Sequence, residues 1–420
     1  MREERVAILH YTAPPVIGGV EAVINTQAQL LAKRGYPVTI IAGQGEPGSL
    51  PEAVDLLLIP ELNSQHPRVL DLSAELEEGR CPAEFDELTQ QLTDELAAEV
   101  SHYDHLIVHN VFTKRFNLPL TTALHRLIDE GAIRHAIAWC HDFDWTSPRS
   151  RSKVHPRFPW DLLRTYKPAV TYVTVSQQRR ETLADMLDCS LDEIHLIYNG
   201  VDTPTLLGLT EEGWAMIERL DLMDADLILL MPVRVTRAKN IEYALRVVAA
   251  LKEQGQGPKL LLTGPPDPHD QESLSYFQSL QRLRNELGLE DQMHFVYESG
   301  PKPDEPYTIS FPVVCDLYRV SDLLLMPSHR EGFGMPILEA GLVGLPVFCS
   351  TTVPAANEIG DSDVVQFDLD TPADQVAERI LNALRDSPVH QLRRRTRQNY
   401  TWQALFEQKI EPLLETEGTP

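Results

Sequence analysis

The sequence is short of basic residues and has no long apolar run and no cysteine pattern, and each absence excludes a class of protein. Its 37 Lys and Arg stand against 62 Asp and Glu, giving a formal charge of −25, which argues against general binding of nucleic acid or of anionic membranes. No apolar run approaches a membrane span, and the start, MREERVAILH, lacks the apolar region of a signal peptide. The five cysteines are isolated and have no metal-ligand spacing. We therefore expect a cytoplasmic protein with no nucleic-acid partner and no stable membrane anchor.

The common nucleotide-binding fingerprints are also missing. The sequence contains neither the GxGxxG of dinucleotide oxidoreductases nor the Walker loop of P-loop NTPases, so both classes are disfavoured. It has no tandem repeat at solenoid spacing and no low-complexity tract. With 43% hydrophobic and 24% charged residues over 420 positions, the composition predicts a globular protein of two domains.

Short apolar runs alternate with helical patterns along the chain. The strand-like run RVAILH (5–10), the helical pattern at 20–35 and the run PVTIIAG (37–43) predict a β-α-β unit of a parallel sheet. Residues 44–82 are rich in Pro, Gly and acids and predict an irregular insertion. Beyond them we expect a helix at about 83–101 and strands within 105–110, 136–142, 169–176 and 194–200.

The alternation restarts in the second half, after residues 201–223, which contain TPTLLGL and an acidic helical pattern and which we expect to be a linker. DLILLMPVRV (226–235), a following helix and the strand KLLLTG repeat the first pattern. The sequence therefore predicts an α/β protein with two doubly wound domains facing one another across a cleft. We place the first domain at 1–200, the second at 201–395 and a last amphipathic segment at 396–420.

The stretch HREGFGMPILEAG (329–341) carries two acids around a glycine-rich turn. Apolar runs at 323–326 and 345–350 flank it, so we expect a loop and then a helix with Pro336 in the first helical position. Exposed N–H groups and the positive end of a helix dipole would meet in the turn at 332–335, which predicts an anion site. Glu331, at the strand end, and Glu339, in the first helical turn, would flank this site.

Basic and glycine residues follow two other predicted strands. Arg234 and Lys239 in RVTRAKN would lie at the carboxyl end of the second sheet, where they could hold a phosphate, although a solvated basic loop is the alternative. Gly18 and Gly19 begin the first helix and permit close approach of a ligand phosphate or sugar, although a plain turn would also explain them.

Polar residues end two neighbouring strands of the first half. His141 and Asp142 close one strand, and His109 and Asn110 close the strand before it. A structural histidine is the alternative for each. Their position at carboxyl ends of strands, beside a predicted cleft, favours a role in binding.

The sequence resembles a known family. EGFGMPILEA resembles the Glu-x7-Glu signature of retaining nucleotide-sugar glycosyltransferases of the GT-B fold, in particular glycosyltransferase family 4. The resemblance covers nearly the whole chain, in the family's order. Its further motifs are GGVEAVI (18–24), CHD (140–142), VTVSQ (173–177), YNGVD (198–202), RVTRAK (234–239) and PSHREGFG (327–334).

The resemblance implies a role for each candidate residue. Glu331 would bind hydroxyls of the donor sugar, Glu339 the ribose, and Arg234 and Lys239 the diphosphate. His141 would touch the donor sugar from the other domain. Gly18 and Gly19 open the matching glycine motif, and Gly19 would approach the diphosphate. The turn whose backbone holds sugar hydroxyls and diphosphate comprises Phe333, Gly334, Met335, Pro336 and Ile337. The last helix would cross back onto the first domain.

The resemblance also implies the chemistry. A hexose would pass, with retention of configuration, from a donor of the GDP-mannose or UDP-glucose type to a hydroxyl acceptor, without a protein nucleophile, metal or cofactor. No Asp-x-Asp motif stands at a plausible donor-site strand end. A nucleotide-sugar epimerase or hydrolase on the same fold is the alternative, and a non-enzymatic sugar-nucleotide-binding protein is a third reading.

Two segments bear on specificity. The proline-rich residues 300–314 lie where the family recognises the base and are longer than is usual there. Residues 146–167 hold six basic side chains against one acid, directly after His141 and Asp142, where the family places its acceptor. We expect Arg149 and Arg151 to attract a small anionic acceptor, with His109, Asn110 and Asp142 nearby. A solvated loop, or one that pairs with nearby acids, is the alternative, and anionic lipid is a third possibility.

Overall fold

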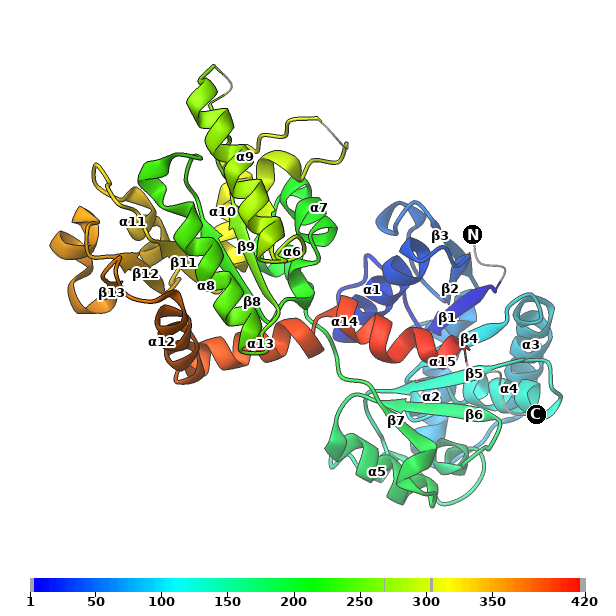
Figure 1. The fold of residues 1–420 in the computed structure, drawn as a ribbon. Helices are drawn as coiled ribbons and strands as arrows, with labels where there is room; N and C mark the ends of the chain where they lie inside the picture. The colour runs from blue at the N-terminus through cyan, green and yellow to red at the C-terminus, as the bar shows by residue number, and fades with distance from the viewer. Residues whose placement is uncertain (1–3, 268, 303–304, 416–420) are drawn as a thin grey trace. The chain divides into compact units, whose positions relative to one another are not determined.

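The computed structural model describes residues 4–267, 269–302 and 305–415, and the chain divides into two compact units. The first comprises Met1–Gly200 and Trp402–Pro420, and the second Val201–Thr401 (Figure 1). The predicted boundary at 395 falls inside helix α13 (Pro388–Asn399), so the structure moves it to the end of that helix, after Thr401. Residues 1–3 and 416–420, which the predicted ranges include, lie outside the described residues.

The first unit is built on a seven-stranded parallel sheet in the order β3-β2-β1-β4-β5-β6-β7. Ile8 of β1 pairs with Ile40 of β2 on one side and with Ile107 of β4 on the other. The strand order reverses between β1 and β4, which makes this pair the switch point where ligands of such folds bind. The strands are β1 (Val6–His10), β2 (Val38–Ala42), β3 (Val54–Leu58), β4 (His105–His109), β5 (Ala136–Cys140), β6 (Val170–Thr174) and β7 (Ile194–Leu196).

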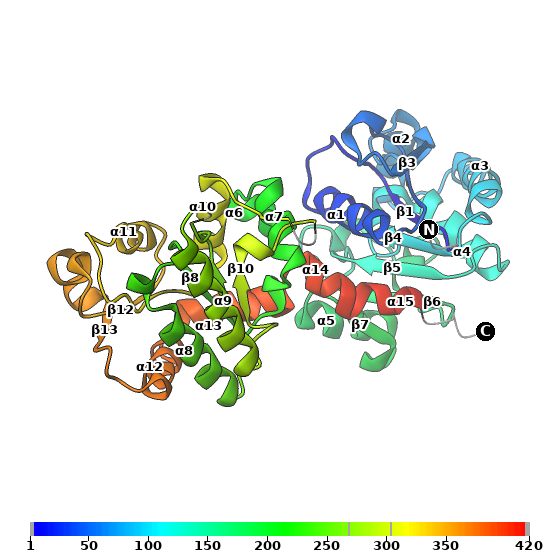
Figure 2. The ribbon, with the colours of Figure 1, turned by 45° about the horizontal axis from the view of Figure 1, so that its top comes forward.

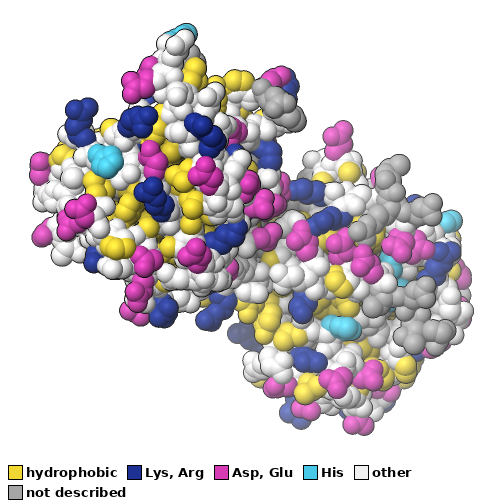
Figure 3. All heavy atoms as spheres, viewed as in Figure 1, with side chains coloured by type: hydrophobic (Ala, Val, Ile, Leu, Met, Phe, Trp, Pro, Cys, Tyr) yellow, Lys and Arg dark blue, Asp and Glu magenta, His cyan; other side chains and the backbone are white. Residues whose placement is uncertain are grey.

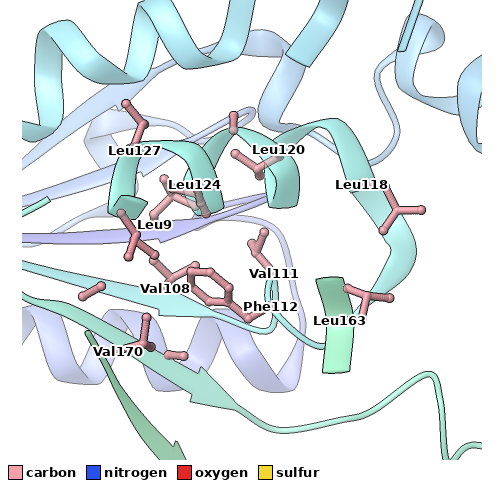
Figure 4. Close-up of a cluster of buried hydrophobic side chains, with 14 of the residues drawn as sticks. Leu9, Val108, Val111, Phe112, Leu118, Leu120, Leu124, Leu127, Leu163 and Val170 are labelled. Carbon is pink, nitrogen blue, oxygen red and sulfur yellow. The ribbon is translucent and has the colours of Figure 1, made fainter. Parts of the chain in front are cut away.

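Helices cover both faces of this sheet, because its strand residues point alternately to two cores. Val6 and Ile8 pack with α1 (Gly19–Lys33) and with the end of the chain, α14 (Trp402–Leu405), the π-turn Phe406–Ile410 and α15 (Glu411–Glu415) (Figure 2). Ala7 and Leu9 face the other core. Figure 4 shows Leu124 of α4 near Leu9 and Val108 in that core. Its helices are α2 (Pro67–Glu77), α3 (Ala83–Val100), α4 (Leu118–Asp129) and α5 (Gln177–Leu187).

The expectation that residues 44–82 form an irregular insertion is wrong. They contain strand β3, which extends the sheet by pairing with β2, and helix α2, whose Val69 and Leu72 are buried. β3 lies at the edge of the sheet, and only Val54 of its five residues is buried. The apolar run at 56–59 was not recognised as a strand, because the residues around it are rich in Pro, Gly and acids.

The second unit repeats the design with a six-stranded parallel sheet in the order β10-β9-β8-β11-β12-β13. The order reverses between β8 and β11, the switch point of this unit. The predicted α/β class with two doubly wound units is therefore confirmed. The strands are β8 (Leu227–Met231), β9 (Pro258–Leu262), β10 (Met293–Phe295), β11 (Leu323–Met326), β12 (Val347–Ser350) and β13 (Val365–Phe367).

The second sheet is also covered on both faces. Leu229 of β8 packs into the core formed with one set of helices and Leu230 into the core formed with the other. The first set is α8 (Ile241–Glu253), α9 (Gln271–Glu286) and α12 (Ala373–Arg385), and the second is α7 (Glu211–Arg219), α10 (Phe311–Val320) and α11 (Met335–Leu342).

Residues 201–223 are not the expected linker. They form the short helix α6 (Thr203–Leu207) and the helix α7, whose Met216 and Ile217 are fully buried in the second unit. The proline-rich segment packs against α7, since the Tyr307 hydroxyl donates to Glu212 at 2.9 Å. From Phe311 this segment is already helix α10, and its residues 303–304 lie outside the described part.

The surface carries charges of both signs between apolar patches on the face shown in Figure 3. Within the described ranges, no helix is long and apolar enough to cross a membrane.

Candidate functional site

Two loops meet at the β8/β11 switch point of the second unit. The loop after β8 ends in the 3-10 turn Arg237–Lys239, and the loop after β11 leads to Glu331. The amide of His329 donates to the carbonyl oxygen of Ala238 at 2.8 Å, which fastens the two loops together. This brings Lys239 Nζ within 2.6 Å of Glu331 Oε1.

Two donors hold the side chain of Glu331. Its Oε1 accepts from both Lys239 Nζ and the Ser328 hydroxyl, the latter at 2.7 Å, and its side chain is 9% exposed. Oε2 has no hydrogen-bond partner in the described part of the chain, so it can accept from a ligand hydroxyl. Glu331 lies in the loop beyond β11, which ends at Met326, and not at the strand end as predicted.

Arg234 lies at the same edge and is exposed, with no ion-pair partner among the described residues. It lines an open cavity of about 520 Å³ together with Thr236, Pro265 and Tyr276. The chain after β9 passes very close here, because a Cβ on Gly264 would lie only 2.4 Å from the carbonyl oxygen of Val233. Arg234 is thus a free cation next to a cavity large enough for part of a ligand.

The glycine turn is preorganised for an anion. Gly334 has φ +108°, and the carbonyl oxygen of Phe333 accepts from the amide of Ala355 at 2.8 Å. The amides of Phe333, Gly334 and Met335 have no partner among the residues that the structure describes. Helix α11 begins at Met335, so the positive end of its dipole adds to these donors.

Two members of the predicted turn cannot donate. Pro336 has no N–H, and it is the second residue of α11, not the first as predicted. The amide of Ile337 already donates to the carbonyl oxygen of Gly334 at 3.0 Å. The donors of the turn are therefore the three amides that precede Pro336.

Glu339 is the fifth residue of α11, so the expectation that it lies in the first helical turn is wrong. Its Oε2 accepts from the Tyr318 hydroxyl of α10 at 2.5 Å. Burial and this carboxylate raise the pKa of Tyr318, which keeps the hydroxyl protonated as a donor. Sequence reasoning missed Tyr318, because it lies in the apolar pattern of α10 and looks like an ordinary core residue.

In the first unit, the loops after β4 and β5 are fastened by Asn110. This residue has φ +62°, and its Oδ1 accepts from the amides of His141 and Asp142 at 2.9 and 3.2 Å. The Thr113 hydroxyl donates to the carbonyl oxygen of Asp142 at 2.7 Å. Asn110 was predicted to contact the acceptor. In the structure its side-chain oxygen instead holds the loop that carries His141.

His109 and His141 form a buried pair. His109 Nδ1 lies 3.1 Å from His141 Nε2, and the two rings stack with centroids 5.4 Å apart. Burial, with smaller effects from neighbouring histidines, lowers the pKa of His109 well below its usual value and that of His141 to about 4. Both imidazoles are neutral at pH 7. His109 is fully buried, so it cannot be the contact residue predicted for the acceptor.

The two glycines at the start of α1 differ. A Cβ on Gly18 would lie 2.1 Å from Glu21 Oε2, so a larger residue at this position would force that carboxylate to move. Gly19 has open space around it. The Thr12 hydroxyl donates to Glu21 Oε1 at 2.6 Å, which fixes the loop between β1 and α1.

The basic segment at 146–167 divides into anchored and free cations. Lys153 Nζ lies 2.9 Å from Glu77 Oε2, and the Arg164 guanidinium stacks 4.3 Å from the ring of Trp145. Arg149 and Arg151 are exposed and have no ion pair within the described ranges. Asp142, also exposed, pairs with Arg179 at 2.8 Å, a partner the sequence did not indicate.

In the part of the chain that the structure describes, no three His, Cys, Asp or Glu side chains cluster as a metal site would require.

Comparison with known proteins follows the same division into halves. Residues 17–204 match the family described as Glycosyltransferase Family 4, and residues 214–401 match Glycosyl transferases group 1.

Three curated relatives are each 24% identical to the chain. A mannosylglucosylglycerate synthase of Petrotoga mobilis matches over 59% of this chain and 60% of its own length. A D-inositol 3-phosphate glycosyltransferase of Saccharomonospora viridis matches over 95% and 91%, and an MMP alpha-(1->4)-mannosyltransferase of Mycolicibacterium hassiacum over 97% and 97%. The chain therefore has the two-unit GT-B fold, and each of its halves is similar to a domain family of glycosyltransferases.

Proposed function

We propose that the chain transfers a hexose, with retention of configuration, from a nucleoside-diphosphate sugar of the GDP-mannose or UDP-glucose type to a small hydroxyl acceptor. The observation that supports this most is the ion pair of Lys239 and Glu331, which is followed by a turn with unpaired amides at the β8/β11 switch point. A nucleotide sugar needs cations and amides for its diphosphate and a carboxylate for its hydroxyls, and this edge offers all three.

The leaving diphosphate develops negative charge as the sugar–phosphate bond breaks. Lys239, Arg234 and the turn amides, with the helix dipole of α11, would stabilise this charge by preorganised electrostatics. Glu331 Oε2 would accept from a sugar hydroxyl, and Glu339 would hold the ribose. No metal is needed in this account, so we expect activity to persist in excess EDTA. Strict dependence on magnesium or manganese would overturn it.

The first unit would supply the remaining contacts. In the family, the residue matching His141 touches the donor sugar, and the neutral imidazole seen here suits a hydrogen bond to a hydroxyl. Gly19, with open space around it, suits close approach of the diphosphate.

The experiment that tests the donor is a panel of nucleotide sugars followed by thermal shift. A donor at 100 times its dissociation constant should stabilise the protein by roughly 2.7 kcal/mol. Release of nucleoside diphosphate should then require an acceptor. Release that is independent of acceptor would favour the hydrolase reading, and a changed sugar without release would favour the epimerase.

We propose an anionic group on the acceptor, because Arg149 and Arg151 are unpaired in a segment that Lys153 and Arg164 hold in place. Two relatives support this by name, since one acts on an inositol phosphate and the other is named for a glycerate. An exposed pair of arginines in a chain of charge −25 would attract such a group selectively.

A phosphorylated or carboxylated acceptor should be compared with its neutral analogue in wild type and in Arg149→Ala/Arg151→Ala. We expect the variant to lose activity only toward the anionic acceptor, with an effect that weakens in salt. Arg164→Ala is the matched control, because it removes a cation of the same segment that is packed on Trp145. An equal change of activity toward the anionic and the neutral acceptor would mean that the two arginines do not recognise the anionic group.

A further inference from the structure

Three side chains of the first unit, those of Gln27, His109 and His141, are linked in a row by their polar atoms. Gln27 of α1 lies 3.0 Å from His109 Nε2 through its Oε1, and His109 Nδ1 lies 3.1 Å from His141 Nε2. All three residues are buried, and Gln27 and His109 are fully so. No residue motif in the sequence marks Gln27, which falls on the buried stripe of its helix.

His109 cannot act as donor to both neighbours. Burial holds its pKa far below 7, so the ring carries a single N–H, at Nδ1 or at Nε2. The ring is also fixed between His141 on one side and Trp139 on the other, whose centroids lie 5.4 and 5.7 Å from its own. The hydrogen-bond partner of one ring nitrogen therefore determines whether the other ring nitrogen is a donor or an acceptor.

We propose that Gln27 and His109 are positioning residues that determine which ring nitrogen of His141 carries its proton. Gln27 Oε1 accepts from His109 Nε2–H, and this leaves His109 Nδ1 bare. His109 Nδ1 then accepts from His141 Nε2–H, and this leaves His141 Nδ1 bare. His141 thereby presents a lone pair, and not an N–H, to a hydroxyl of the bound sugar. This inference rests on the proposed contact between His141 and the donor.

The remaining polar neighbours are compatible with this arrangement. His10 Nδ1 lies 3.0 Å from the carbonyl oxygen of His109, so this nitrogen must carry the His10 proton and cannot compete for the ring of His109. The amide of His141 is bound by Asn110, which fixes the backbone from which the imidazole projects. Of the three histidines in this group, only His109 and His141 have a tautomer that no backbone partner fixes.

The identity of residue 27 argues against a purely structural role. The Nε2 of Gln27 is buried and has no hydrogen-bond partner among the described residues. An orphaned buried donor costs stability, and an apolar side chain in this core would avoid that cost. Gln27 is explained if its carbonyl oxygen is needed by His109.

Helix α1 connects this row of side chains to the donor side of the unit. The helix begins at Gly19, whose surroundings are open to a diphosphate, and carries Gln27 further along. The element that would meet the donor at its N-terminus therefore also orients the imidazole of His141.

The direct test is the ¹⁵N spectrum of the histidine rings in the intact protein, which separates bare from protonated ring nitrogens. His141 is assigned by the signal that disappears in His141→Ala. We expect a bare Nδ1 and a protonated Nε2 on His141 in wild type. A protonated Nδ1 would overturn the proposal without any variant of Gln27 having to fold.

The variant test is Gln27→Met, with Gln29→Met as a matched control at an exposed position of the same helix. The thioether of methionine is a much weaker acceptor than an amide oxygen, so the His109 proton should move to Nδ1, and the His141 proton should then move onto its own Nδ1. We expect kcat/KM for the donor to fall about ten-fold, the loss of one well-placed hydrogen bond. Gln27→Glu keeps an acceptor at this position and should restore the wild-type proton pattern and much of the activity.

The outcomes separate this inference from the proposed function. If His141→Ala turns over normally, the contact of His141 with the donor is wrong and the positioning role falls with it. If His141→Ala is impaired but Gln27→Met matches Gln29→Met in activity and in proton pattern, only the positioning role is overturned. Thermal denaturation of each variant distinguishes these results from loss of folding.

Discussion

The pair of Lys239 and Glu331 shows how a site for a charged ligand can be stable while it is empty. An isolated carboxylate at 9% exposure would be costly, and the pairing with Lys239 offsets part of that cost. When a diphosphate approaches, Lys239 gains a second anion, and a sugar hydroxyl can donate to the unused Oε2 of Glu331. Lys239 and Glu331 therefore each have a hydrogen-bond or ion-pair partner both before and after the ligand binds.

The first prediction concerns this pair. Lys239→Ala should lower kcat/KM by roughly ten- to a hundred-fold, because a charge-assisted hydrogen bond contributes about 1.5–3 kcal/mol. It should also lower the free energy of unfolding, since Glu331 loses its counter-charge. Steady-state kinetics and urea unfolding measure the two effects. Lys252→Ala, on the same unit at the end of α8, is the control. Wild-type kinetics in Lys239→Ala would place the donor elsewhere.

The second prediction concerns Tyr318. Tyr318→Phe removes the hydroxyl that orients Glu339, so KM for the donor should rise about three- to ten-fold, for a net hydrogen-bond contribution of about 0.5–1.5 kcal/mol. Tyr243→Phe is a matched control, because its hydroxyl donates at 2.6 Å to the carbonyl oxygen of Thr371. The two variants should lose similar stability, but only Tyr318→Phe should change KM. If Tyr318→Phe and Tyr243→Phe have equal KM values for the donor, Glu339 does not take part in donor binding.

At the level of single residues, the sequence indicated the charged members of the site but not the residues that orient them. Lys239 and Glu331 stand in motifs and attract attention by their charge. Tyr318 and Gln27 lie on the buried stripes of α10 and α1, where a pattern of apolar positions hides them. Their partners are distant in sequence, so only the folded chain shows what they contact.

At the level of elements, the glycine turn before α11 carries the third prediction. Gly334→Ala would force alanine to φ +108° and set its Cβ 2.7 Å from Val353 Cγ1. We expect a loss of about 1–3 kcal/mol in the free energy of unfolding and weaker donor binding, since the turn amides would be displaced. Gly332→Ala is the control, because a Cβ there meets nothing within 4 Å. If both variants unfold alike, the turn is not rigid.

The elements that sequence patterns predicted are those with continuous apolar runs, such as β8 and β11. One of the elements that were missed is held by a buried charged group. Helix α13 was not expected, because its sequence PVHQLRRRTRQN has no apolar stripe. It is nevertheless fixed to the sheet by Arg397, which is buried and donates at 2.9 Å to Asp322. A pattern search that counts only apolar residues cannot find a helix held by an ion pair.

At the level of the whole molecule, buried histidines predict a loss of stability in mild acid. Burial lowers the pKa of four of them to about 4, from 6.5 in the unfolded chain. Between these values the unfolded state binds more protons, so the free energy of unfolding falls as pH falls from 6.5 toward 4. Urea midpoints measured across this range should decrease steadily. The four residues are His125, His135, His141 and His294.

His125 allows the cause to be isolated. Both of its ring nitrogens are buried without a partner in the described part of the chain, so His125→Leu should flatten the pH dependence and leave stability at pH 7 nearly unchanged. His102→Leu, at an exposed position, should leave the slope as it is. An unchanged slope in His125→Leu would mean that other groups control the acid response.

The route of the chain has a consequence for synthesis. The first unit uses Phe406 and Ile410, which follow the second unit in the sequence, to cover Val6 and Ile8, which precede it. The second unit is continuous and can fold as soon as it leaves the ribosome. One apolar face of the first sheet, which α1 covers only in part, therefore remains incompletely covered while the whole second unit is translated. The nascent chain should depend on chaperones during that interval, and a stop codon just before Trp402 would make the exposure permanent.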